Sequence, residues 1–330
     1  MRVLAARHHG GPEQLHWRDL PDPVLGPRQV RVGVAAIGLN FAELVQLSGD
    51  FQIPAPDPLV PGFELAGTIV EVGSDVTTFT LGQRVMALVG WGAYTDRLVV
   101  DAAHVLPVPE SMDDLTAAAF PVAYATAHLS LLHRGGMREG ETVVVTGATG
   151  NVGTAALQVA RAAGARVIAV DRSGALPPTA ADHVLRPPGL ARVVRELTGG
   201  RGADLALDLV GGAVTTELLD ALAWEGRLVT TGFASGSVPE VSLLDVLVRN
   251  IAIVGEDVAG YAARDIATAT LALHQCLSWY GEGLLAPRRP VRHSVAGLAA
   301  ALGSIADGTA LHKLAVDLRG EHPIVRGPLA

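Results

Sequence analysis

The chain has 330 residues, of which 49% are hydrophobic and 38 are glycine, and its formal net charge is −8. These values are typical of a folded protein with two domains, and the negative charge argues against nucleic acid as the main partner. The N-terminal apolar run, 1–6, is too short for a signal peptide. No stretch reaches the roughly 18–20 apolar residues of a membrane span. We therefore expect a cytoplasmic protein with no membrane partner.

The part of the chain before residue 121 predicts a β-rich region. Glycine and proline turns separate its apolar segments, which is typical of a small, partly closed β-domain. The expected strands are 29–37, 64–72, 83–89 and 94–100.

The pattern then changes to alternating helices and strands. Residues 113–133 have helical spacing interrupted by Pro121. Apolar strands that alternate with helices predict an α/β fold, a Rossmann doubly wound parallel sheet covered on both faces. The expected strands are 142–146, 166–170, 205–209, 227–232 and 251–254, and the helices are 152–163, 190–198 and 214–223.

The tail after residue 262 has helices at 263–280 and 295–306 and a strand at 314–318. It has no core of its own. We expect it to return and complete the first, β-rich domain.

A glycine-rich turn joins the strand 142–146 to the helix that follows. Gly150 lets the backbone approach a pyrophosphate, and Gly153 lets the helix pack closely on the strand. The free N–H groups of the first helical turn would face the phosphates. The alternative is a turn that binds no ligand. The candidate cofactor-binding residues of this turn are Gly147, Thr149, Gly150, Asn151 and Val152.

Asp171 stands at the end of the next strand, where an acidic side chain holds the adenosine ribose hydroxyls in dinucleotide-binding folds. Arg172, beside it, could instead pair with the 2′-phosphate of NADP. An ordinary solvated aspartate is a further alternative. The residues therefore leave NAD and NADP both open.

From these residues outward the chain resembles the zinc-independent quinone oxidoreductase branch of the medium-chain dehydrogenase/reductase superfamily. The segment 140–153 with Gln158 and Arg161 is similar to the signature of that branch, although Thr149 and Asn151 depart from it. Further matching segments are 36–43, 60–67, 121–127, 208–212, 226–236 and 312–314. The resemblance implies a catalytic domain at 1–122 and 263–330, with a Rossmann domain at 123–262. It favours NADP(H) slightly over NAD(H).

The resemblance also implies that the chain holds no metal. In zinc alcohol dehydrogenases of the superfamily the metal ligands are a cysteine and a histidine, and the matching positions here are Asn40 (or Leu39) and Phe63. Phenylalanine cannot ligate a metal, and Cys276 is the single cysteine, so a cysteine-rich zinc lobe is excluded within one chain. Without a Lewis acid an alcohol is hard to oxidise, whereas a conjugated acceptor needs less help.

Three candidate catalytic residues, Asn40, Glu43 and Phe51, lie in the segment that faces nicotinamide and substrate in the resembling family. Asn40 would hold a substrate oxygen or the cofactor amide; a turn residue is the alternative. Glu43 replaces an aspartate, which makes its role less secure. Phe51 takes the place of a tyrosine and has no proton to donate, but it can wall a pocket. The proton would then come from water or from the substrate.

Other positions match cofactor-facing residues of the family. Thr126 would reach the nicotinamide ribose, and Lys313 would approach the cofactor unless it is a surface lysine. The remaining cofactor-binding candidates lie at strand ends, because ligands bind at the carboxyl ends of the strands in open parallel sheets. These candidates are Val210, Gly232, Phe233 and Val254.

Three functions follow as hypotheses. The first is an NAD(P)H-dependent reductase of quinones, and the second is an enoyl or 2-alkenal reductase that acts on an activated C=C bond. The third is a non-catalytic dinucleotide-binding protein. The resemblance also suggests that the strand 251–254 pairs with its copy in a homodimer; its apolar, uncharged edge would otherwise be an aggregation hazard.

Overall fold

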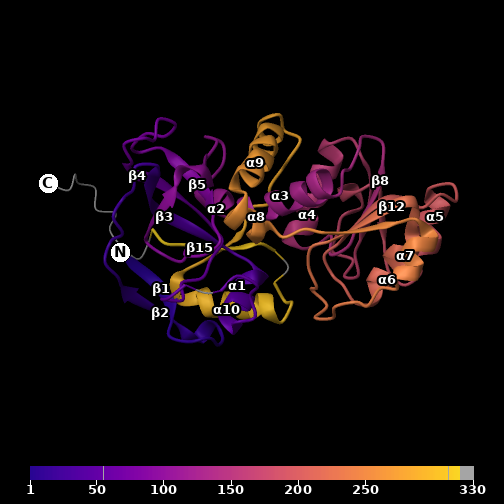
Figure 1. Ribbon diagram of the computed structural model, residues 1–330, viewed down its shortest axis with the longest axis horizontal. Coiled ribbons are helices and arrows are strands. Elements are labelled where there is room, and N and C mark those ends of the chain that lie inside the picture. The colour runs from indigo at the N-terminus through magenta and orange to yellow at the C-terminus, as the bar shows by residue number, and fades with distance from the viewer. Residues whose placement is uncertain (55, 311, 320–330) are drawn as a thin grey trace. The chain divides into compact units, whose positions relative to one another are not determined.

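The computed structural model describes residues 1–54, 56–310 and 312–319 (Figure 1). The chain forms two compact units. The first unit contains Met1–Val122, Ala259–Thr270 and Pro287–Ala330, and the second contains Ala123–Val258 and Leu271–Ala286. Within the described residues no helix combines the length and the apolar character that crossing a membrane requires.

The first unit is built on a seven-stranded sheet in the order β14-β15-β3-β4-β5-β7, with β6 paired to β3. A separate antiparallel pair, β1 and β2, lies beside it in the same core. The strands are β1 (Arg2–Ala6), β2 (Leu15–Asp19), β3 (Gln29–Leu39), β4 (Glu64–Val72), β5 (Arg84–Leu88), β6 (Arg97–Asp101), β7 (Val105–Pro107), β14 (Val291–His293) and β15 (Leu314–Asp317).

Strand β3 organises this sheet because its two halves have different partners on one side. Residues Gln29–Gly33 pair with β6, and Ala36–Leu39 pair with β15. The opposite side of β3 pairs with β4. The strand β15 near the end of the chain therefore belongs to the first sheet.

Short helices accompany the first unit. Helix α1 begins directly after β3, and α2 packs on β3, β4, β5 and β15. The bounds are η1 (Pro12–Gln14), α1 (Phe41–Ser48), η2 (Ala102–His104), α2 (Asp114–Ala118), α8 (Val258–Arg264), η5 (Val295–Gly297) and α10 (Leu298–Ala306). The longer helix α9 (Ile266–Gly281) begins in the first unit, and from Leu271 onward it belongs to the second.

The second unit contains a six-stranded sheet in the order β10-β9-β8-β11-β12-β13, and every pair in it is parallel. All four residues of β8 are buried, as expected for a strand covered on both faces. The strands are β8 (Thr142–Val145), β9 (Arg166–Val170), β10 (His183–Leu185), β11 (Ala203–Asp208), β12 (Leu222–Thr230) and β13 (Ala252–Gly255).

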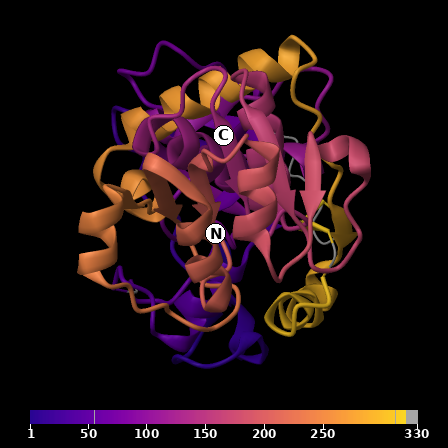
Figure 2. The ribbon, with the colours of Figure 1, turned by 90° about the vertical axis from the view of Figure 1, so that its right-hand side faces the viewer.

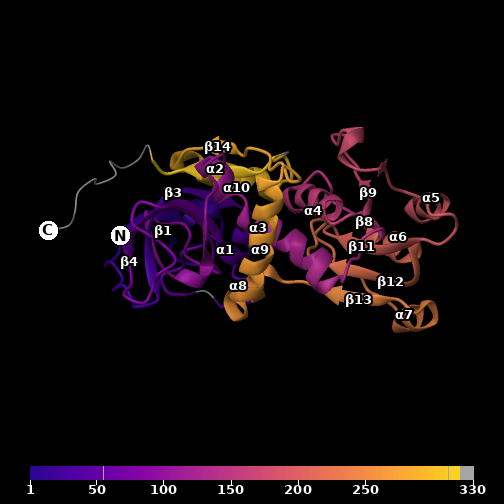
Figure 3. The same cartoon turned by 90° about the horizontal axis from the view of Figure 1, so that it is seen from above.

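Two groups of helices pack on this sheet (Figures 2 and 3). Helix α4 contacts β8, β9 and η3, and η3 also contacts β12, whereas α6 contacts α5, β11 and β12. The parallel strands and these helices confirm the predicted α/β fold. The helices are α3 (Pro121–His128), the π-helical turn η3 (Leu129–Arg134), α4 (Asn151–Ala162), η4 (Pro178–Ala180), α5 (Leu190–Leu197), α6 (Ala213–Ala221) and α7 (Leu243–Arg249).

Candidate functional site

The turn between β8 and α4 has the geometry of a phosphate-binding loop. Gly147 has a φ of +58°, which glycine adopts without strain. A Cβ added at Gly153 would lie 2.2 Å from the carbonyl oxygen of Gly147, so only glycine allows this close packing. No side chain caps the N-terminus of α4, and the N–H groups of a first helical turn have no partner within the helix. These donors fit a pyrophosphate, so the residues present fit a dinucleotide.

The other candidates of the second unit follow strand ends on the same edge of the sheet. Asp171 follows β9, Val210 follows β11, and Gly232 with Phe233 follows β12, while Val254 is the next-to-last residue of β13. In a parallel sheet the carboxyl ends of all strands share one edge, and this is the edge where ligands bind. The structure thus brings these residues to the edge that carries the phosphate-binding loop.

Asp208, at the end of β11, ties this edge together. Its Oδ1 accepts hydrogen bonds from Thr146 Oγ1 and from the N–H groups of Val210 and Gly211, each at 3.0 Å. Its Oδ2 accepts one from Thr215 Oγ1 at 2.6 Å. The side chain is 1% exposed. Asp208 therefore fixes the ends of β8 and β11 beside the phosphate-binding loop, a role that the sequence analysis did not assign.

The carboxylate of Asp171 is engaged by its own loop. Oδ1 accepts from the backbone N–H of Ser173 at 2.7 Å and from its hydroxyl at 2.6 Å, and Oδ2 accepts from the N–H of Leu176 at 2.8 Å. Burial alone would raise the pKa of Asp171, but these hydrogen bonds outweigh it and hold the pKa below its ordinary value. The Asp171 carboxylate therefore stabilises the loop that follows it, and both of its oxygens already accept hydrogen bonds from that loop.

Two arginines follow the ends of neighbouring strands at this loop. Arg172 follows β9 and Arg186 follows β10, and the N–H of Asp171 donates to the carbonyl of Leu185 at 2.9 Å. A Cβ added at Gly174 would lie 2.3 Å from Nη2 of Arg186, so that guanidinium lies against the loop. Both side chains are exposed. The sequence analysis named Arg172 but missed Arg186, whose strand β10 has only three residues.

Thr126 lies on α3 and is 3% exposed. Its hydroxyl is buried and has no hydrogen-bond partner among the described residues. Two residues earlier, Tyr124 donates from its hydroxyl to Gln158 on α4 at 3.0 Å. Tyr124 therefore anchors α3 to α4, while the Thr126 hydroxyl keeps its hydrogen-bonding capacity.

In the first unit, Asn40 connects β3 to α1 and lies at the centre of a charged network. Its Nδ2 donates to Glu43 Oε1 at 3.2 Å and to Glu64 Oε1 at 3.0 Å. Its Oδ1 accepts from Lys313 Nζ at 2.5 Å, and Lys313 Nζ lies 2.6 Å from Glu64 Oε1. Both amide hydrogens of Asn40 therefore have carboxylate acceptors. Lys313 is 8% exposed and belongs to this network, not to the surface.

The two glutamates of the network have separate structural tasks. Glu43, in the first turn of α1, accepts the N–H of Asn40 at 2.6 Å, which is one half of a capping box. Glu64 Oε2 accepts the N–H of Val122 at 2.8 Å. Burial raises the pKa of Glu43 to about 8, although Lys313 and Asn40 act to lower it. Burial thus favours the neutral form of Glu43 beside the Glu64–Lys313 ion pair.

Phe51 belongs to an aromatic cluster. Its ring centroid lies 5.4 Å from that of Phe63 and 5.8 Å from that of Trp91, both in edge-to-face geometry. Phe63 is one of the two positions matched to zinc ligands, and it is 2% exposed. A search of the described residues for three or more His, Cys, Asp or Glu side chains able to hold a metal finds no such group.

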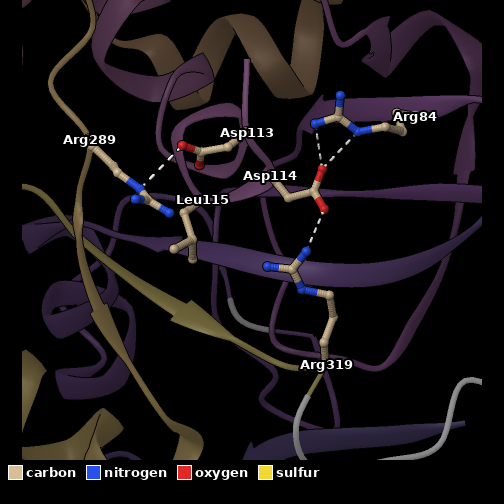
Figure 4. Close-up of a pocket in the computed structure, with 6 residues that line it drawn as sticks. All are labelled: Arg84, Asp113, Asp114, Leu115, Arg289 and Arg319. Carbon is tan, nitrogen blue, oxygen red and sulfur yellow. Dashed lines mark hydrogen bonds and ion pairs between the residues drawn. The ribbon is translucent and has the colours of Figure 1, made fainter. Parts of the chain in front are cut away.

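A separate pocket of about 310 Å³ lies in the first unit (Figure 4). Arg84 contacts Asp114 through Nε at 2.9 Å and Nη2 at 2.6 Å, and Arg319 contacts the same carboxylate at 3.0 Å. Arg289 lies 3.2 Å from Asp113. Each guanidinium in the pocket already has a carboxylate partner, so we interpret the cluster as an ion-pair network that joins α2 to β5 and the tail.

Two family models match the chain. One, described as an alcohol dehydrogenase GroES-like domain, matches residues 26–110, and the other, described as a zinc-binding dehydrogenase, matches residues 151–273. Quinone oxidoreductase-like protein 2 of Mus musculus is 36% identical over 274 residues, which are 81% of this chain and 78% of that protein.

Solved structures agree with these matches. A quinone oxidoreductase of Pseudomonas syringae pv. Tomato DC3000 has a TM-score of 0.85 and 28% identity, and the match covers 96% of this chain and 99% of that one. A mycobacterial protein complexed with NADPH has a TM-score of 0.86 and 26% identity, covering 96% of this chain and 100% of that one. The chain therefore belongs to the zinc-independent quinone oxidoreductase branch of the medium-chain dehydrogenase/reductase superfamily.

Proposed function

We propose that the protein is an NADPH-dependent reductase of quinones that works without zinc. The observation that carries this proposal is the set of side chains around Asn40. Both Asn40 amide hydrogens and its Oδ1 are bonded within the network of Glu43, Glu64 and Lys313. Phe63, the other position matched to a zinc ligand, has no donor atom. This set contains no Cys or His, and its two carboxylates are already bonded to Asn40, Val122 and Lys313, so it does not suit zinc, which takes Cys, His or carboxylate ligands in tetrahedral geometry.

The choice of acceptor follows from this chemistry. A bound reduced nicotinamide supplies a hydride, and the protein has to orient the acceptor and keep water away. A quinone spreads the incoming charge over its conjugated ring, so it needs no Lewis acid. Phe51 and Trp91 are partly exposed and, backed in part by the buried Phe63, supply an aromatic surface against which a flat ring can pack. Phe51 has no proton to give, so the hydroquinone oxygens take theirs from water.

NADPH is favoured over NADH by the adenosine end of the sheet. Both oxygens of Asp171 accept hydrogen bonds from Ser173 and Leu176, which leaves this carboxylate poorly placed to hold ribose hydroxyls as well. Arg172 and Arg186 are exposed beside it. Guanidinium groups bind phosphate in bidentate geometry, so the pair suits a 2′-phosphate.

The first test is oxidation of NADPH and NADH with 1,4-benzoquinone, 9,10-phenanthrenequinone and a simple enone, each with and without a chelator. We expect turnover of a quinone with NADPH that the chelator does not change. Turnover confined to the enone would replace the proposal by reduction of an activated C=C bond. Inhibition by the chelator would refute zinc independence. Tight NADPH binding without turnover of any acceptor would favour a non-catalytic dinucleotide-binding protein.

A further inference from the structure

Glu256 is a buried carboxyl group at the cofactor-binding edge of the second unit. It follows β13 directly, and its N–H donates to the carbonyl of Thr230, the last residue of β12, at 3.1 Å. Its side chain is 8% exposed. The sequence analysis named Val254 on this strand but not Glu256. A burial of this degree is rare for glutamate and needs partners.

Among the described residues, Glu256 has a hydrogen-bond partner on one oxygen only. Ser130 Oγ donates to its Oε2 at 3.3 Å and lies 3.0 Å from Thr231 Oγ1. Its Oε1 is buried and has no hydrogen-bond partner among the described residues. Ser130 belongs to the π-helical turn η3, and single π-helical turns are frequent at functional sites. One turn earlier on the same helix, the Thr126 hydroxyl is also unpartnered.

The chemical state of this carboxyl suits an amide ligand. Burial raises the pKa of Glu256 to about 8; the Ser130 hydrogen bond lowers it, Asp257 raises it and Arg134 lowers it. A carboxyl oxygen can accept a hydrogen bond, or donate one when it carries the proton. A primary carboxamide has both an N–H donor and a carbonyl acceptor, so it can complement Oε1 in either form.

The strand order indicates which part of a dinucleotide would meet Glu256. The phosphate-binding loop follows β8, with β9 and β10 on one side of it and β11, β12 and β13 on the other. In this fold the acidic position after the second strand belongs to the adenosine half, which here is Asp171. The nicotinamide half therefore extends toward β12 and β13.

We propose that Glu256 binds the carboxamide of the nicotinamide ring through Oε1, with Ser130 and Thr231 holding the carboxyl in place. The inference rests on the proposed function, because it requires a nicotinamide dinucleotide. It adds a side-chain contact that would fix the orientation of the ring.

The test compares two ligands on the full chain. NADPH carries the nicotinamide, whereas 2′,5′-ADP carries only the adenosine half. Glu256→Leu removes the polar group, and Glu256→Gln keeps a donor and an acceptor in the same shape. Asp257→Asn, at the exposed neighbouring carboxylate, is the matched control. Affinities are measured by titration calorimetry, and folding is checked by thermal unfolding.

We expect Glu256→Leu to lose roughly tenfold in NADPH affinity with no change for 2′,5′-ADP, whereas Glu256→Gln and Asp257→Asn bind both ligands as the native protein does. Unchanged NADPH binding by Glu256→Leu would overturn the inference, as would an equal loss for both ligands, which would indicate a structural role. A native protein that binds neither ligand would refute the proposed function itself, and this inference would fall with it.

Discussion

The ammonium group of Lys313 lies 2.6 Å from Oε1 of Glu64, and both side chains are buried. Lys313 comes from the segment before β15 and Glu64 begins β4, so the pair joins the tail of the chain to the first sheet. Removing one member of a buried ion pair leaves an unpaired charge, which is costly.

Lys313→Met should therefore lower the free energy of unfolding by about 3–5 kcal/mol. Adding Glu64→Gln should restore part of this loss, because no buried charge then lacks a partner. Urea unfolding of the two single variants and the double variant measures the coupling. Additive effects would show that the two groups do not interact.

The raised pKa of Glu43 gives stability a defined pH dependence. Its pKa moves from an ordinary value of 4.5 to about 8 on folding, so the folded state holds a proton that the unfolded chain releases. This contribution is fully present below 4.5 and is lost as the pH rises through about 8. Asn40, Glu64 and Lys313 face Glu43 and are unchanged in the variant below.

Glu43→Gln should make the stability curve flatter between pH 4.5 and about pH 8, the two pKa values of Glu43. The check is the urea midpoint of the native protein and the variant across this range. Glu256→Gln is a useful companion, since burial also raises the pKa of Glu256 to about 8. A slope unchanged by Glu43→Gln would mean that Glu43 titrates normally.

Asp208 accepts four hydrogen bonds from donors at the ends of β8 and β11 and from α6. Asp208→Ala leaves these donors without their acceptor and should cost about 2–4 kcal/mol of unfolding free energy. NADPH affinity should fall as well. Asp208→Asn keeps one oxygen in place and should cost less than half as much. Equal losses in the two variants would contradict this account.

The proposed preference for NADPH can be tested at Arg172 and Arg186, which are both exposed. Arg172→Ala and Arg186→Ala should each weaken NADPH binding by roughly tenfold and leave NADH binding unchanged. The exposed Arg192, which pairs with Glu196 on α5, serves as the matched control. Fluorescence titration of both cofactors gives the affinities. A parallel loss for NADH would show that the arginines do not contact the 2′-phosphate.

The edge strand β13 predicts a homodimer. It ends the six-stranded sheet and is followed in space by α7 (Figure 3). Ile253 on β13 is 39% exposed, and Leu243 and Leu247 of α7 are 82% and 74% exposed. Ile253→Lys should convert a dimer to a monomer, measured by light scattering during size-exclusion chromatography. Leu271→Lys, at another exposed leucine, should not. A native protein with the mass of a monomer would refute the dimer.

Local sequence patterns were sufficient to predict most strands and helices of the second unit. The strand at 166–170 and the glycine turn after β8 could be predicted because continuous apolar runs and glycines carry their own signal. Strand β10 and helix α7 were missed: β10 has three residues, and α7 has no buried residue that would reveal a periodic apolar face.

Side-chain partners that are distant in sequence could not be predicted. Asn40 and Lys313 are separated by 273 positions and Ser130 and Glu256 by 126. A motif that contains Glu64 or Glu256 does not reveal which charge or hydroxyl the fold will bring to it. The place of Asp171 at the end of a strand could be predicted from the sequence. Its three hydrogen-bond donors could not, because they depend on the backbone conformation of Ser173–Leu176, which the residue types alone do not determine.

Strands β6 and β15 pair with the same side of β3, and this affects the order in which the two sheets can form during synthesis. Residues Ala36–Leu39 pair with Leu314–Asp317, so a ribosome must translate nearly the whole chain before this edge is closed. The strands β8 to β13 are all available earlier. We therefore expect the parallel sheet to form during synthesis while the first sheet waits with an open edge. An unpaired strand edge can pair wrongly with another chain. We therefore expect the growing chain to depend most on a chaperone before residues 314–317 have been translated, while the edge at 36–39 has no partner.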